Sequence, residues 1–138
     1  MREPKFISRE GIPILYVDFS NLKSKDEIFE LIDLAKKSIS MRPPKSVLTL
    51  TNLANMYFNT EVYTAISDYA KMNEPFVRAC AVIGLNGLMM IFYNGFLKLT
   101  KRDVRAFSSE EEAVNYLLGV SRSEVGNSIK EGANHLFF

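Results

Sequence analysis

An uncharged run extends from Ala79 to Leu97 and restricts what the chain can fold into. Its length makes a membrane span the first alternative to consider. Three glycines and two asparagines interrupt the run: Gly84, Gly87, Gly95, Asn86 and Asn94. In lipid these groups would lie where water cannot reach them, whereas a strand, a turn and a helix use them naturally. The run therefore predicts a buried strand over 79–83 that leads into a buried helix, and no membrane span.

The rest of the chain alternates between strand and helix patterns. Two β-prone runs, 6–8 and 12–19, are separated by a short gap containing Glu10 and Gly11, which predicts a hairpin. Further strands are predicted over 47–51 and 104–107. Together with the helices described next, this order predicts an α/β fold with a mostly parallel five-stranded sheet and an N-terminal hairpin at its edge.

Helix starts are marked by capping residues. Ser24 and Glu27 form a capping box, either Asn59 or Thr60 can cap a second helix, and a serine at 108 or 109 can cap the last one. With the helix that follows the central strand, the complete order is β-β-α-β-α-β-α-β-α.

The composition changes after residue 120. Residues 121–138 are polar, include two glycines and show no helical periodicity. We therefore predict one α/β domain over 1–120 and a weakly structured C-terminal tail over 121–138. The alternative is that Leu136, Phe137 and Phe138 anchor the tail in a groove on the domain or on a neighbour.

Charge and composition exclude several classes of protein. The net charge is +1, which gives no long-range attraction to nucleic acid or anionic membrane. The charged N-terminus does not resemble a signal peptide, so a cytoplasmic location is expected. One cysteine, Cys80, and one histidine, His135, exclude an internal disulfide and a His/Cys zinc set. Neither a metal nor a cofactor is predicted, and without a paired nucleophile and base an enzyme is not expected.

Three segments carry a resemblance to a known family: YVDFSNL at 16–22, NEPFVRACAVIGLNGL at 73–88 and KRDVRAFSSEEEAVNYL at 101–117. They are spread over most of residues 5–120. With the order of elements, they resemble the STAS fold, named for sulfate transporters and anti-sigma-factor antagonists, and in particular small bacterial STAS-like proteins. The resemblance implies a β-α superhelix with strands in sequential order.

The resemblance also implies a role. It points to a non-enzymatic regulatory module of the anti-sigma-antagonist type, which contacts a regulatory kinase, an anti-sigma-like protein or a second copy of itself. In signalling members, a hydroxyl at the start of the helix after the third strand is phosphorylated and controls partner binding. The matching residue is Thr60, although the Asp-Ser-Ser-Gly type of motif is absent here.

Polar residues at the carboxyl ends of the predicted strands give an alternative function. Ligands of parallel α/β sheets bind at these ends. The candidates for a small-ligand or lipid-headgroup site are Asp18, Ser20, Thr51, Asn52 and Asn86. Asp18 has the strongest individual claim, because a carboxylate at the end of a buried strand needs a partner, for which Asn21 or Lys23 is near. Helix caps and turns also use these residue types.

The helix that follows the central strand supplies a candidate interface. Its spacing predicts that five residues face the sheet: Leu85, Leu88, Phe92, Phe96 and Leu99. The opposite stripe then carries the candidate interface residues Met90, Ile91, Asn94 and Lys98. Apolar residues on an exposed stripe mark a contact surface. The alternative is a helix that is buried on all sides.

Overall fold

The computed structural model describes the backbone of residues 2–100 and 102–137 and the side chains of residues 2–100 and 102–123. Strands and helices follow each other in the predicted order, β-β-α-β-α-β-α-β-α, which confirms the α/β fold. In this part of the chain the elements are β1 (Lys5–Arg9), β2 (Ile12–Asp18), α1 (Lys25–Ser40), β3 (Val47–Asn52), α2 (Thr60–Asn73), β4 (Val77–Ile83), α3 (Gly87–Thr100), β5 (Val104–Phe107) and α4 (Glu110–Phe137).

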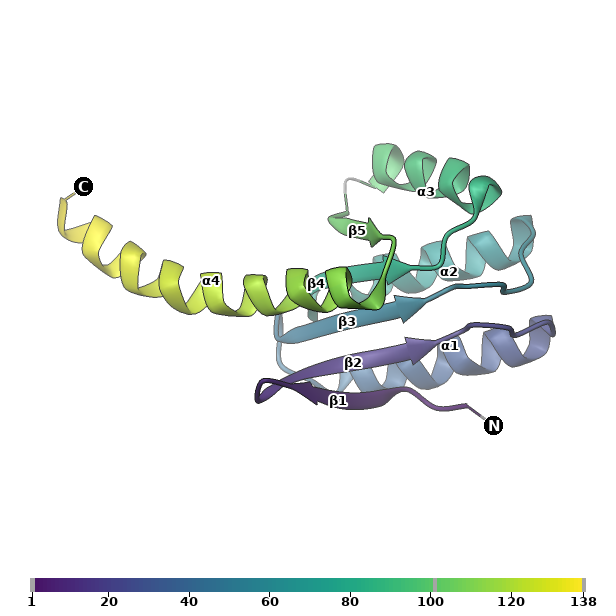
Figure 1. Cartoon of the computed structure of the whole chain (residues 1–138), viewed down its shortest axis with the longest axis horizontal. Coiled ribbons are helices and arrows are strands. Elements are labelled where there is room, and N and C mark those ends of the chain that lie inside the picture. The colour runs from purple at the N-terminus through teal and green to yellow at the C-terminus, as the bar shows by residue number, and fades with distance from the viewer. Residues whose placement is uncertain (1, 101, 138) are drawn as a thin grey trace.

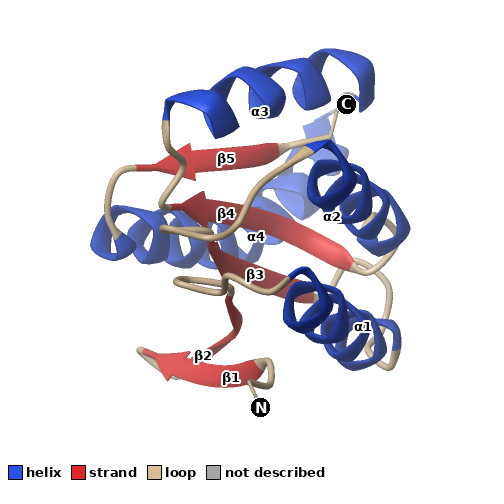
Figure 2. Ribbon diagram, turned by 90° about the vertical axis from the view of Figure 1, so that its right-hand side faces the viewer, coloured by secondary structure: helices blue, strands red, loops and turns tan. Residues whose placement is uncertain are grey.

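The sheet has the strand order β1-β2-β3-β4-β5, so strands that are consecutive in the chain are neighbours in space. β1 pairs with β2 in the antiparallel sense, and the other pairs are parallel. Helices α1 and α2 cover one face, α3 lies beside β5, and α4 lies on the opposite face (Figures 1 and 2). Two apolar clusters result, one between the sheet and α1–α3 and one between the sheet and α4.

Local sequence signals account for most element boundaries. Glu10 and Gly11 both have positive φ, at 51° and 77°, which is the geometry of a tight turn between twisted antiparallel strands. The Ser24 side chain accepts a hydrogen bond from the Glu27 backbone N–H at 3.4 Å, as a capping box requires. Asn59, rather than Thr60, caps α2.

Helix α4 is longer than we predicted. It starts after Ser109, whose hydroxyl accepts from the Glu112 N–H at 3.2 Å, and it continues through Phe137. The backbone of 121–137 follows this helix, since interior glycines cost only about 1 kcal/mol each and no proline follows residue 120. The anchoring of Leu136, Phe137 and Phe138 lies outside the residues whose side chains are described. The division into a domain over 1–120 and a separate tail stays a prediction.

The face that α3 turns to the sheet also differs from the prediction. Leu88 and Leu99, which we expected to face the sheet, are 53% and 83% exposed, whereas Met89 and Phe96 are buried. The helix begins at the cap, where the Asn86 Oδ1 accepts from the Met89 N–H at 2.8 Å. Helix α3 lies beside the short edge strand β5, so only a narrow stripe of it is covered (Figure 2).

The end of β4 meets the end of β3 at Gly84. Its φ is +84°, and a Cβ built there would lie 2.4 Å from the Ala54 backbone nitrogen. Only glycine combines this left-handed conformation with such a close approach of two backbones. The β4–α3 turn and the β3–α2 loop are therefore in direct contact.

We predict that Gly84→Ala lowers the free energy of unfolding by roughly 2–5 kcal/mol, because it adds both backbone strain and a clash with Ala54. Urea denaturation measures the change. The matched control is Gly87→Ala in the same turn, where a Cβ would meet nothing within 4 Å. That control should leave stability unchanged or raise it by up to about 1 kcal/mol. Equal effects of the two substitutions would contradict the close-contact explanation.

Candidate functional site

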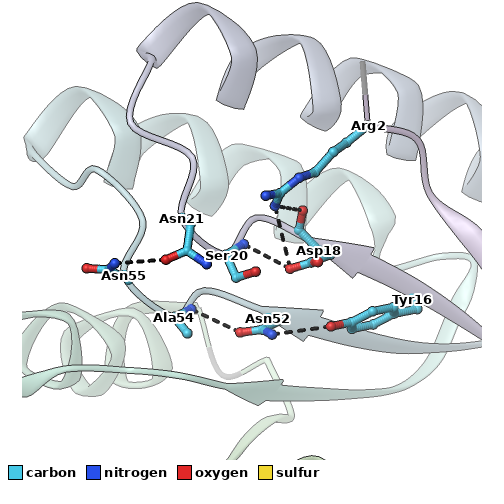
Figure 3. A network of polar contacts seen from close by, with 8 residues as sticks. All are labelled: Arg2, Tyr16, Asp18, Ser20, Asn21, Asn52, Ala54 and Asn55. Atoms are coloured by element: carbon cyan, nitrogen blue, oxygen red, sulfur yellow. Dashed lines mark hydrogen bonds and ion pairs between the residues drawn. The ribbon is translucent and has the colours of Figure 1, made fainter.

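A polar network joins the ends of β2 and β3, where Asp18 and Asn52 are register neighbours (Figure 3). The Asp18 Oδ1 accepts from the Ser20 backbone N–H at 2.9 Å. The Arg2 guanidinium donates to the Asp18 carbonyl at 2.9 Å, and its Nη1 lies 3.7 Å from the carboxylate. Asp18 therefore has Ser20 and Arg2 as partners, in place of the Asn21 and Lys23 that sequence suggested.

Asn52 links the network to Tyr16 on β2. Its Oδ1 accepts from the Ala54 N–H at 3.0 Å, and its Nδ2 donates to the Tyr16 hydroxyl at 3.2 Å. Burial raises the pKa of the Tyr16 phenol, and the bond from Asn52 opposes this rise only in part. Tyr16 is therefore neutral at physiological pH, and Asn52 acts as a turn residue that holds the β3–α2 loop.

A second pair of asparagines connects the two loops beyond the strands. Asn21 and Asn55 both have positive φ, at 62° and 58°, and the Asn55 Nδ2 donates to the Asn21 Oδ1 at 2.8 Å. The Lys23 ammonium donates to the Asn55 carbonyl oxygen at 2.7 Å. Sequence reasoning did not find this bridge, although asparagine in a turn is the available signal, since it tolerates left-handed backbone better than most residues.

The five strand-end candidates do not form one site. Asp18, Ser20 and Asn52 belong to the network just described. Asn86 caps α3, and Thr51 is 7% exposed and faces the interior between α2 and α3. An open hollow of about 430 Å³ does lie beside Asp18, and it is lined by Arg2, Glu3, Lys5, Tyr16 and Asp18.

The chemistry of this edge is that of satisfied polar groups. The Asp18 carboxylate accepts a backbone hydrogen bond and lies near an arginine, and the asparagine side chains are used in turns and caps. Among the described residues, His, Cys, Asp and Glu side chains do not gather into a group that could hold a metal ion.

Thr60, the candidate for phosphorylation, is the first residue of α2 and is exposed. Its carbonyl oxygen accepts from the Thr64 hydroxyl at 2.9 Å, while Asn59 carries out the capping. The capping hydrogen bond of α2 is therefore made by Asn59 and not by the Thr60 side chain.

The exposed side of α3 forms a surface that we call the α3 outer face: Leu88, Ile91, Asn94, Lys98 and Leu99. All five residues are exposed, and Ile91 near the centre is 69% exposed. Of the four predicted interface residues, Ile91, Asn94 and Lys98 lie on this face, whereas Met90 is half-buried at its border. Leu88 and Leu99 are the residues that sequence reasoning missed, because it placed them against the sheet.

No family model matches the sequence, and no curated protein matches it. Within the described residues, each helix is too short or too polar to cross a membrane.

We predict that Asn21 and Asn55 are energetically coupled by roughly 0.5–1.5 kcal/mol, because each loses its partner when the other is replaced by alanine. A double-mutant cycle of Asn21→Ala and Asn55→Ala, measured by urea denaturation, gives this coupling. A second cycle of Asn55→Ala with Ser109→Ala serves as the control, since Ser109 caps α4 on the opposite face of the sheet. The control cycle should be additive. A first cycle that is equally additive would contradict the proposed bridge.

Proposed function

We propose that this chain is a non-enzymatic regulatory module of the STAS-like kind, which binds a partner protein through the α3 outer face. The observation that carries the proposal is the exposure of three large aliphatic side chains on one helix: Leu88 at 53%, Ile91 at 69% and Leu99 at 83%. Exposed apolar side chains that cluster on one surface mark sites of association. Further support comes from the polar groups at the strand ends, which are engaged in caps and turns.

Charge indicates the chemistry of the partner. Helix α3 contains no Asp or Glu, and Lys98 lies in its last turn. In an antiparallel pairing of two α3 helices, each Lys98 would approach a helix start that carries no carboxylate. In a parallel pairing, the two lysines would approach each other. The α3 outer face therefore suits a different protein that presents an apolar stripe flanked by Asp or Glu, and a second copy of this chain is the alternative.

The proposed partner is a regulatory kinase or an anti-sigma-like protein, as the STAS-like resemblance implies. Thr60 is proposed as the switch, and its exposed position outside the α2 cap is compatible with access by a kinase. A phosphate on the first residue of a helix lies at the positive end of the helix dipole, so the modification would not destabilise α2.

We predict that Ile91→Glu weakens partner binding at least tenfold, because it places a charge in the apolar centre of the face and repels an acidic partner. Stability should change by no more than about 0.5 kcal/mol, since Ile91 is exposed. The test installs a photo-crosslinking amino acid at position 91 in native cells and then measures the affinity of the captured partner for the wild type and for Ile91→Glu.

The matched control is Met41, an 82% exposed apolar residue on the loop after α1. A crosslinker at Met41 should not capture the same partner, and Met41→Glu should leave affinity unchanged. Identical capture from both positions would contradict the proposed surface. If the chain instead crosslinks to itself and sediments as a dimer, the partner of this face is a second copy of the chain and not an acidic protein.

We predict that protein isolated from its native cells carries phosphate on Thr60. Thr64, which is exposed one turn further along α2 and donates to the Thr60 carbonyl, should carry none and serves as the internal control. Peptide mass spectrometry distinguishes the two positions. Partner affinity that is the same for phosphorylated and unmodified protein would contradict the switch while leaving the α3 outer face untouched.

A further inference from the structure

A cavity of about 100 Å³ lies between α2, α3 and the sheet. Its floor is formed by Thr51 of β3, Cys80 and Val82 of β4 and Val104 of β5. The walls come from one side of α2 and from the inner side of α3: Tyr63, Ile66, Ser67, Tyr69, Ala70, Met89, Phe92, Tyr93 and Phe96. Small side chains on both sides leave this space unfilled: Ser67 and Ala70 line it from α2, and Thr51 and Cys80 line it from the sheet.

The surface that faces this cavity is almost entirely apolar. Two of the lining tyrosines use their hydroxyls elsewhere, since Tyr93 donates to the Val104 carbonyl at 2.6 Å and Tyr69 shares a hydrogen bond with Asn73. A water molecule needs two to four polar partners, which this surface does not supply. The cavity is therefore expected to exclude water and to accept an apolar occupant.

The cavity also has a route to solvent. Phe58, Tyr63 and Phe92 line it, and each of them retains exposed surface. Their rings contact one another, with centroids 5.3 Å apart for Phe58 and Phe92 and 4.8 Å apart for Tyr63 and Phe92. Rotation of these side chains would open the cavity without moving the sheet.

Cys80 lines the cavity and is partly accessible from it. It lies in the middle of β4, between two neighbouring strands and beneath the helices, yet it retains partial exposure. Burial raises the pKa of its thiol, and the Thr49 side chain is its hydrogen-bond partner. Cys80 is therefore a weak nucleophile, and it serves here as a reporter of what fills the cavity rather than as a reactive group.

We propose that this cavity binds a single uncharged alkyl chain, which enters between Phe58, Tyr63 and Phe92 and ends over Cys80. The volume excludes drug-sized ligands, whose pockets measure about 300 Å³ or more. It is closer to the engineered apolar cavity of about 150 Å³ that stays dry and binds benzene. The residues that line it carry no charged side chain in the described part of the chain, so a charged end would have to stay outside. This inference is independent of the α3 outer face, which lies on the opposite side of the helix.

Titration with 1-propanol, 1-butanol and 1-pentanol tests the proposal, with methyl NMR of Met89 and Val82 as the readout. Saturable shifts are expected, and the affinity should rise about fourfold for each added methylene until the cavity is full. Because the chain has one cysteine, alkylation of Cys80 at alkaline pH gives a second readout, which a bound alkanol should slow. Shifts that do not saturate, or an affinity that is the same for all three alcohols, would overturn the proposal.

Ala70→Leu fills the cavity from α2 and should abolish the saturable shifts. Ala65→Leu is the matched control, because it makes the same change on the same helix at a residue that does not line the cavity. If Ala70→Leu does not fold, Cys80→Ile fills the cavity from the sheet with a residue suited to a strand. Wild-type affinity in a folded filling variant would show that the alkanols bind elsewhere and would overturn the assignment.

Discussion

Burial of β4 on both faces is the constraint on which the rest of the structure depends. Ala79 and Ala81 point toward α4, while Cys80 and Val82 point toward α2 and α3. A strand covered on both sides must be apolar where it is covered, and from Ala79 to Ala81 the covered residues are also small. The alanines leave room for α4 to pack directly on the sheet. On the other face, the small Cys80 side chain contributes to the empty space beneath α3.

Helix α3 combines two different environments because it lies at the edge of the sheet. Its inner side covers a cavity and the short strand β5, so Met89 and Phe96 are buried. Its outer side has no covering element in the described part of the chain, and Ile91 and Leu99 remain exposed there. A central helix would have buried both sides. The proposed partner surface and the proposed ligand cavity therefore share one cause, the position of α3 beside β5.

The polar residues at the strand ends illustrate how much of a candidate site can be predicted from sequence. Residue types identified Asp18, Asn52 and Asn86 as candidates for ligand binding or for caps and turns, and in the structure each has a hydrogen-bond partner within the chain. The partners themselves were not predictable, because Arg2 and Tyr16 reach this edge only through strand pairing. The Asn21–Asn55 bridge joins residues 34 positions apart and depends on the approach of the β2–α1 loop to the β3–α2 loop, where the Asn21 N–H donates to the Ala54 carbonyl at 2.9 Å.

The sequence by itself determined the order of strands and helices, the hairpin turn at Glu10 and Gly11, and the cap at Ser24, because these depend on backbone preferences and neighbours within four residues. The tertiary structure alone decided which side of α3 is buried, where Thr51 points and that a cavity remains above Cys80. Apolar residues occur on all sides of α3, so its spacing did not define a face. Only the position of the helix relative to β5 and α2 selects which residues meet the core.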